Sequence, residues 1–243
     1  MYTLLKKEVS SFLSSLTGYI VITVFLLING LALWVLPVAS NILDYGYANI
    51  DGLFLIAPIV FLFLIPAITM RMFSEENKSG TIELLLTKPL TDLQIILAKY
   101  LAGLTLVVFS LLPTLVYFYS VYQLGLPKGN IDMGGMWGSY IGLLFLGAAF
   151  LSIGLFTSSI TNNQIIAFII SLILCGFIYF GFELIYTLDL FGHIDLLIRS
   201  LGISAHYSSI SRGVIDTRDL LYFFSLISLF ILLTRISLQS RKW

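Results

Sequence analysis

The sequence predicts an all-α polytopic membrane protein with six transmembrane helices, an N-terminal interfacial helix and a short amphipathic helix on the cytoplasmic side. Of the 243 residues, 58% are hydrophobic and only 11% are charged. A soluble domain carries about 25% charged residues, so this chain cannot form an ordinary polar surface. The mean hydropathy of +1.00 supports the same conclusion. Thirteen basic and thirteen acidic residues balance, so the net charge predicts no nucleic-acid partner.

The N-terminal segment, residues 1–16, predicts a helix that lies in the membrane surface. Apolar side chains recur there at helical spacing, at Leu5, Val9, Phe12 and Leu16. Lysines and serines occupy the rest of the helical wheel, which is typical of an interfacial helix. A frayed polar tail is the alternative. Glu8 precedes the apolar run and no small-residue cleavage site follows it, so the segment does not resemble a secretory signal.

Five long charge-free intervals supply the membrane spans, because about 20 apolar residues cross the hydrocarbon core as a helix. The interval between Asp132 and Glu183 holds 50 residues, and a polar run at 158–164 divides it into two spans. The last interval holds only 15 residues, but Arg235 at its end can extend its stem to the interface. The chain is therefore one transmembrane domain with spans at about 18–38, 53–70, 100–122, 137–157, 165–186 and 220–238.

The distribution of Lys and Arg predicts that both termini are cytoplasmic. With that orientation, nine basic residues lie inside and four lie outside. Cytoplasmic loops carry the excess of Lys and Arg in membrane proteins.

The connection between the second and third spans, residues 71–99, is longer and more charged than a simple loop requires. Gly80 can break the chain, and Thr81 can cap a short helix whose apolar face holds Ile82, Leu85 and Leu86. Pro89 ends that helix. Thr91 and Gln94 form the pattern of a capping box, which predicts a new helix that runs into the third span.

This connection resembles the signature of ABC-2 type membrane subunits of ABC transporters, roughly E-x-x-x-G-T-x-E-x-L-x-x-x-P followed by a lysine at the foot of the third span. Here the pattern runs from Glu76 to Pro89, and the lysine is Lys99. The span count, the surface helix and the cytoplasmic termini extend the resemblance over essentially the whole chain. It implies that the connection is a coupling helix docking into an ATP-binding subunit, with these interface residues: Glu75, Glu76, Gly80, Thr81, Glu83 and Pro89.

The resemblance also implies the partners. They are two copies of a P-loop ATP-binding subunit and a second permease subunit or a second copy of this chain. More narrowly, the sequence is similar to gliding-motility-associated ABC permease subunits of Bacteroidetes, partly through residues 213–219. A second permease with a large periplasmic domain would then be expected. Other relatives serve copper-enzyme maturation or the export of sodium, drugs or polysaccharide.

No catalytic constellation is found in the sequence, so we expect the chain not to be an enzyme. None of its seven lysines follows a glycine, and a P-loop therefore does not occur. The two histidines, His193 and His206, are too sparse for a zinc site, and Cys175 stands alone. No nucleophile elbow is present. We expect no cofactor and no metal.

Two residues in the outer half are further candidates for ion or substrate contact. Glu183 lies near the outer end of the fifth span, where an acid is a functional candidate by default. A solvated helix end is its simpler interpretation. Arg212 lies in the outer connection 187–218, which also carries an apolar stripe typical of a short helix: Ile194, Leu197, Ile198 and Leu201.

A proton-driven or sodium-driven secondary carrier is the main alternative function. Such carriers need ionisable groups or broken helices near the bilayer midplane. The spans offer only Glu183 and Arg235, both near helix ends. A membrane-embedded enzyme is the third possibility, and it lacks the required residues. Gly138 and Gly142 form a small-xxx-small pair that can serve either packing within the chain or a partner permease.

Overall fold

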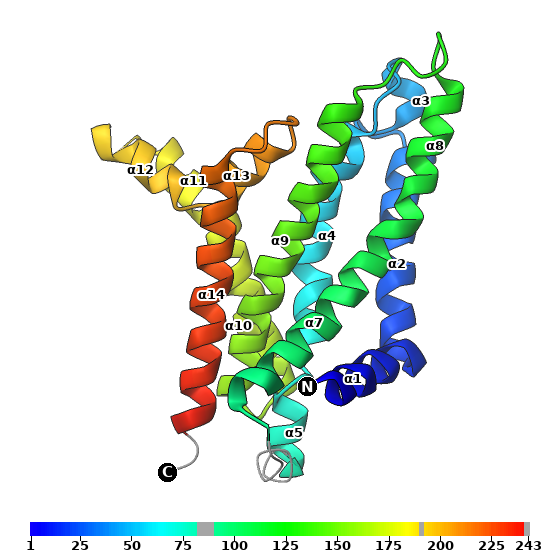
Figure 1. The fold of residues 1–243 in the computed structure, drawn as a ribbon. Helices are drawn as coiled ribbons and strands as arrows, with labels where there is room; N and C mark the ends of the chain where they lie inside the picture. The colour runs from blue at the N-terminus through cyan, green and yellow to red at the C-terminus, as the bar shows by residue number, and fades with distance from the viewer. Residues whose placement is uncertain (82–89, 190–191, 241–243) are drawn as a thin grey trace.

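The computed structural model describes residues 1–81, 90–189 and 192–240 and confirms the all-α membrane fold. Six helical stretches in this part of the chain are long and apolar enough to cross a membrane. They form one elongated bundle, with α1 (Tyr2–Ser14) lying across its foot and short helices crossing its opposite end (Figure 1). We call these the α5 end and the α13 end, after α5 (Ser74–Ser79) and α13 (Ile203–Ile210).

The spans agree closely with the predicted ones. They are α2 (Leu16–Trp34), α4 (Asp51–Thr69), α7 with η1 and α8 (Asp92–Leu111, Leu112–Thr114 and Leu115–Leu124), α9 (Met133–Ile160), α10 with the π-helix η2 and α11 (Gln164–Gly176, Phe177–Gly181 and Phe182–Thr187), and α14 (Thr217–Ser240). The short α3 (Ile42–Tyr45), η3 (Gly192–Ile194) and α12 (Asp195–Ser200) belong to the connections at the α13 end.

Local sequence sets several of these boundaries. Thr91 and Gln94 make the predicted capping box at the start of α7. The predicted first span was too long, because the helix ends at Trp34, three residues before Pro37, which has no N–H for a helical bond. Asp216 begins α14 by accepting from the backbone N–H of Arg218 at 3.0 Å, which lowers the pKa of its carboxyl.

The N-terminal helix is confirmed, but its buried face differs from the predicted apolar stripe. Leu4 and Glu8 are the buried residues of α1, while Leu16, a predicted member of the stripe, begins α2 and is 76% exposed. The reason is that α1 packs against α7, where Glu8 meets Lys99 at 3.5 Å beside the buried Leu4.

Helix α9 occupies the centre of the bundle and contacts α4, α7, α10 and α14. Its glycines permit close approach. A Cβ on Gly138 would lie 2.6 Å from the carbonyl oxygen of Ile210, and one on Gly142 would lie 3.3 Å from the Tyr207 ring. Because both neighbours belong to α13 of the same chain, the small-xxx-small pair serves packing within the protomer.

Candidate functional site

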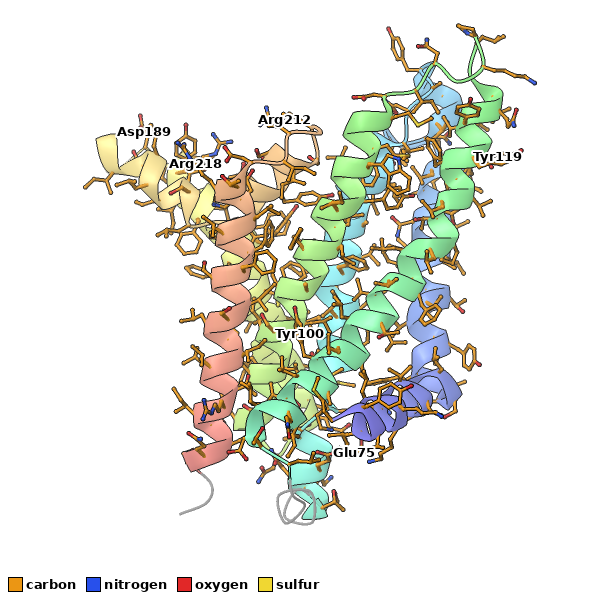
Figure 2. The ribbon with its side chains drawn as sticks, in the orientation of Figure 1. Glu75, Tyr100, Tyr119, Asp189, Arg212 and Arg218 are labelled. Carbon is orange, nitrogen blue, oxygen red and sulfur yellow. The ribbon has the colours of Figure 1, made fainter. Side chains whose placement is uncertain are left out.

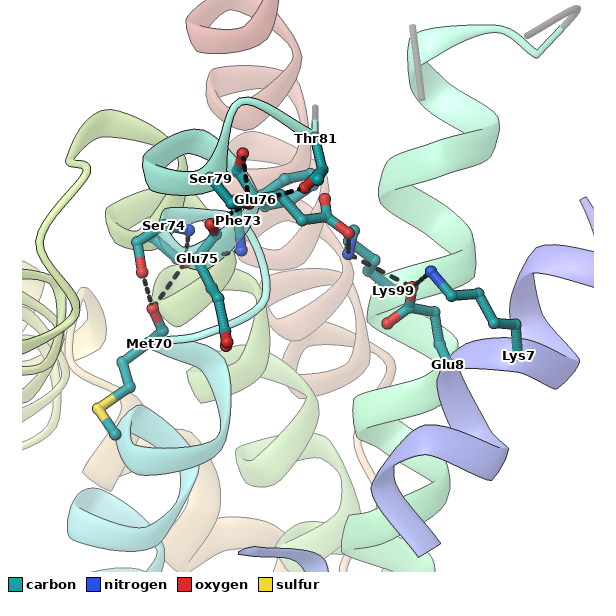
Figure 3. Close-up of polar contacts among 11 residues, drawn as sticks. Lys7, Glu8, Met70, Phe73, Ser74, Glu75, Glu76, Ser79, Thr81 and Lys99 are labelled. Atoms are coloured by element: carbon teal, nitrogen blue, oxygen red, sulfur yellow. Dashed lines mark hydrogen bonds and ion pairs between the residues drawn. The ribbon is translucent and has the colours of Figure 1, made fainter. Parts of the chain in front are cut away.

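The candidate site lies at the α5 end, where α4 turns into the segment that carries the predicted interface. The hydroxyl of Ser158 on α9 organises this turn. It accepts from the backbone N–H groups of Phe73 at 3.0 Å and Ser74 at 3.1 Å, and it donates to the carbonyl oxygen of Met70 at 3.2 Å. The Ser74 hydroxyl donates to the same carbonyl (Figure 3). The turn is therefore fixed to the central helix of the bundle.

Lys99 joins three helices at this end through one ammonium group. The residue is buried on α7, and its Nζ lies 2.8 Å from Oε1 of Glu76 on α5 and 3.5 Å from Oε1 of Glu8 on α1. The ammonium also lies 5.3 Å from the centre of the Phe73 ring. Figure 3 shows Lys99 between the two carboxylates. We call Glu8, Glu76 and Lys99 the charge cluster.

Burial determines how much the charge cluster contributes to the stability of the fold. An exposed ion pair contributes about 0 to 1 kcal/mol, because water screens it. A buried cation that loses its partner costs about 3 to 5 kcal/mol, because the charge stays desolvated and uncompensated. The second oxygen of Glu76 has no hydrogen-bond partner among the described residues, so Lys99 is the main compensation for that carboxylate.

The predicted interface residues separate into two groups. Glu76 is half-buried and bonded within the chain, whereas Glu75, Gly80 and Thr81 are exposed. Figure 2 shows Glu75 at the opposite end of the molecule from Asp189, Arg212 and Arg218. Glu83, Pro89 and the predicted short helix at 82–86 lie outside the described residues.

Gly80 ends α5 in a left-handed conformation with φ of +70°. A glycine adopts this conformation without the Cβ clash that other residues meet, which explains the residue type at this position. A Cβ here would meet no atom within 4 Å, so the requirement is conformational rather than one of space.

Sequence reasoning missed two residues of this site, Glu8 and Ser158. An acid in the middle of an amphipathic surface helix was a usable signal, because a charge on the packed face requires a partner. Ser158 was recognised only as part of a polar run that separates two spans. Nothing in the sequence spacing connects it with Phe73, which lies 85 positions earlier.

Glu183 and Arg212, which the sequence predicts to lie outside, line the same cavity at the α13 end. We call it the outer cavity, after the predicted orientation. This cavity has a volume of about 550 Å³ and lies between α4, α9, η2, α11 and α13. Its other charged residues are Asp51 and Asp132. Six hydroxyl side chains also line it, together with Asn49 and several apolar residues: Ser139, Tyr179, Ser204, Tyr207, Ser208 and Ser211.

The helices around this outer cavity are fastened by hydrogen bonds within the chain. Tyr207 donates to the carbonyl oxygen of Phe54 at 2.7 Å, and Ser139 donates to that of Ser211 at 2.8 Å. His206 lies 2.6 Å from Asp219 and 2.8 Å from the carbonyl oxygen of Ser200, which links α12, α13 and α14. No group of three metal-ligating side chains occurs in the described ranges.

The fold and the two ends define a polytopic helical membrane subunit, with an exposed charged segment at one end and a cavity lined by charged, hydroxyl and apolar side chains at the other. Comparison with family models then identifies the family. The model described as ABC-2 family transporter protein matches residues 2–238, so the chain belongs to that family. Its members are membrane permease subunits of ABC transporters, which implies an ATP-binding subunit as partner. No curated protein matches the chain.

Proposed function

We propose that this permease subunit couples ATP hydrolysis in a separate ATPase to transport or mechanical work across the bacterial inner membrane. The observation that carries the proposal is that some residues at α5 are exposed whereas others are bonded to the bundle. Glu75, Gly80 and Thr81 are exposed at the tip, while Glu76 and the preceding turn are bonded to the bundle. A contact made at the tip would thus act on a rigidly attached segment.

The charge cluster and Ser158 supply the route by which force would reach the spans. Movement of α5 displaces Glu76 and the Phe73 turn, which are bonded to α7 and α9 respectively. Because packed helices shift as units, closure of two ATPase copies would rotate the bundle against its partner permease. Glu8 connects α1 to the same motion.

The partner assembly follows from the same proposal. Two copies of the P-loop subunit would dock at α5, and a second permease subunit or a second copy of this chain would complete the pathway. Helix α10 has an exposed isoleucine row for such a contact, at Ile166, Ile169, Ile170 and Ile173. On the sequence resemblance we further propose a role in gliding motility, with a second permease that carries a large periplasmic domain.

The outer cavity is the proposed point of ion or substrate contact. Glu183 and Arg212 line it together with two further carboxylates, although the residues are far apart in sequence. An ion-driven carrier would also need ionisable groups at the midplane. The described spans place Glu183 at a cavity near one end and Arg235 exposed near the other, which favours the ABC permease.

Substitutions at the exposed tip of α5 should weaken ATPase association without unfolding the bundle. Gly80→Val forces a β-branched residue into a positive-φ conformation, and Glu75→Ala removes a charge. If the ATPase buries these groups, each variant should weaken association at least about tenfold, since truncating a buried charge partner costs about 2 to 5 kcal/mol. The measurement is co-purification of the ATP-binding subunit with the full chain.

Asp44→Ala is the control, because Asp44 is an exposed acid at the α13 end. It should leave association unchanged, and both Asp44→Ala and Glu75→Ala should keep the thermal midpoint of the parent. Gly80→Val strains the exposed end of α5 and should lower the midpoint, but the transition should stay cooperative. Unchanged association for both α5 variants would show that the tip is an ordinary loop. Specific nucleotide hydrolysis by the isolated chain would also contradict the proposal.

Cysteine labelling should place the α5 end in the cytoplasm. Single cysteines at exposed positions 78 and 163 should react only with reagent supplied from inside, and those at exposed positions 130 and 214 only from outside. The nine-to-four distribution of basic residues supports this orientation. Cys175 is buried and should contribute no background. Labelling of position 78 from outside would overturn the orientation.

A further inference from the structure

A groove runs along α1 and reaches the first turns of α2. It has a volume of about 610 Å³ and is lined by eight residues: Tyr2, Leu5, Lys6, Val9, Ser10, Leu13, Ser14 and Tyr19. Seven of them lie on α1 and only Tyr19 on α2. This groove is separate from the charge cluster, because none of its lining residues belongs to that cluster.

The lining consists of two parallel rows. Residues four apart stack on one face of a helix, so Leu5, Val9 and Leu13 form an apolar row. By the same spacing, a polar row contains Lys6, Ser10 and Ser14. An apolar row beside a row of one ammonium and two hydroxyl groups suits an amphiphile with an acidic head, because all three polar side chains can donate to phosphate oxygens.

The charge of the groove is positive and has no acidic counterpart. Lys6 is exposed and forms no ion pair among the described residues, and no acid occurs among the eight lining residues. The neighbouring Lys7 does not line the groove, and its ammonium lies 3.8 Å from Oε1 of Glu8. The acid of α1, Glu8, is buried and turned to Lys99, 3.5 Å away. An uncompensated ammonium favours an anionic headgroup, whereas the amine of a zwitterionic lipid would find no carboxylate here.

The position of the groove also fits a lipid. Helix α1 lies across the foot of the bundle and α2 rises from its end (Figure 1). Because α2 is long and apolar enough to span a membrane, the angle between the two helices would fall where headgroups meet acyl chains. Tyr2 and Tyr19 are 76% and 61% exposed, and each lies at the groove. Tyrosine is enriched at this depth, since its ring is apolar and its hydroxyl is polar.

We propose that the groove between α1 and α2 binds an anionic phospholipid of the surrounding leaflet. The phosphate lies at Lys6 and the serine hydroxyls, and the acyl chains follow the apolar row towards Tyr19. The bound lipid fixes α1 at the interface, on the side opposite to its ion pair with Lys99. This binding needs no ATPase and is independent of the proposed coupling function.

The test uses the full chain in neutral detergent, with a bimane fluorophore on Ser11→Cys, an exposed position beside the groove that does not line it. Phosphatidylglycerol with brominated acyl chains should quench the fluorophore at a concentration at least about tenfold lower than brominated phosphatidylcholine. Lys6→Gln should weaken this quenching about fivefold, the effect of one lysine at an anionic surface.

Arg235→Gln is the matched control, because it removes one exposed positive charge at the same end of the bundle from α14. It should leave quenching unchanged, and free glycerol phosphate should not compete. Equal quenching by the two lipids, or an unaltered Lys6→Gln variant, would overturn the proposal. Competition by glycerol phosphate would indicate a phosphate site instead. Shielding from both lipids that grows with protein concentration would indicate a second copy of the chain.

Discussion

Lys99→Met should lower the free energy of unfolding by about 3 kcal/mol, because it leaves two carboxylates facing a buried methionine. Glu76→Gln should cost about 2 kcal/mol, a smaller amount since Lys99 keeps Glu8 at 3.5 Å. The double variant should recover part of the loss, because it removes both charges of the 2.8 Å pair. The measurement is a double-mutant cycle on the unfolding equilibrium in detergent.

Glu75→Gln supplies the comparison within the same helix turn. Glu75 is exposed, so removal of its charge should change stability by no more than about 0.5 kcal/mol. Equal effects at Glu75 and Glu76 would show that the charge cluster contributes nothing to stability. The two residues should also differ in function, since Glu75→Gln acts on ATPase association alone and Glu76→Gln acts on the attachment of α5.

Most of the fold could be predicted from the sequence because the bilayer imposes a simple requirement on it. A spanning helix must satisfy its own backbone bonds and avoid charges, and both conditions leave a local pattern. The start of α7 at Thr91 and the division near 161–163 were predicted for this reason. The length of the first span was overestimated because apolar residues continue past Trp34 although the helix does not.

The motif predicts where candidate interface residues lie along the chain, but it does not predict their contacts, and their role towards an ATPase stays a prediction. A motif locates Glu75, Glu76, Gly80 and Thr81, yet it cannot say which carboxylate is exposed. That depends on the orientation of α5 about its own axis relative to α7, and tertiary packing sets this orientation. The position of Glu183 and Arg212 in one cavity likewise depends on how α13 packs against α9, and no local sequence pattern encodes that packing.

Gly138→Ala should displace α13 and lower the free energy of unfolding by about 3 kcal/mol, at the upper end of the range for overpacking. A Cβ at this position would lie 2.6 Å from the carbonyl oxygen of Ile210 and 2.7 Å from the Cα of Gly213. Both are backbone atoms, so no side chain can rotate away to relieve the clash. The outer cavity lies between these helices and should change with them.

Gly134→Ala on the same helix is the control, because its new Cβ would meet only the Asp132 carboxylate at 3.4 Å, an ordinary contact. Alanine is the better helix former by about 1 kcal/mol, so this variant should be neutral or more stable. Hydrogen exchange should then show faster exchange of the α13 amides in Gly138→Ala alone, with ATPase association intact because α5 lies at the other end. If Gly138→Ala matched Gly134→Ala in both the free energy of unfolding and the hydrogen exchange of α13, the close packing of α13 against α9 would not exist in the membrane. The outer cavity, which brings Glu183 and Arg212 into one lining, would then lose its structural basis.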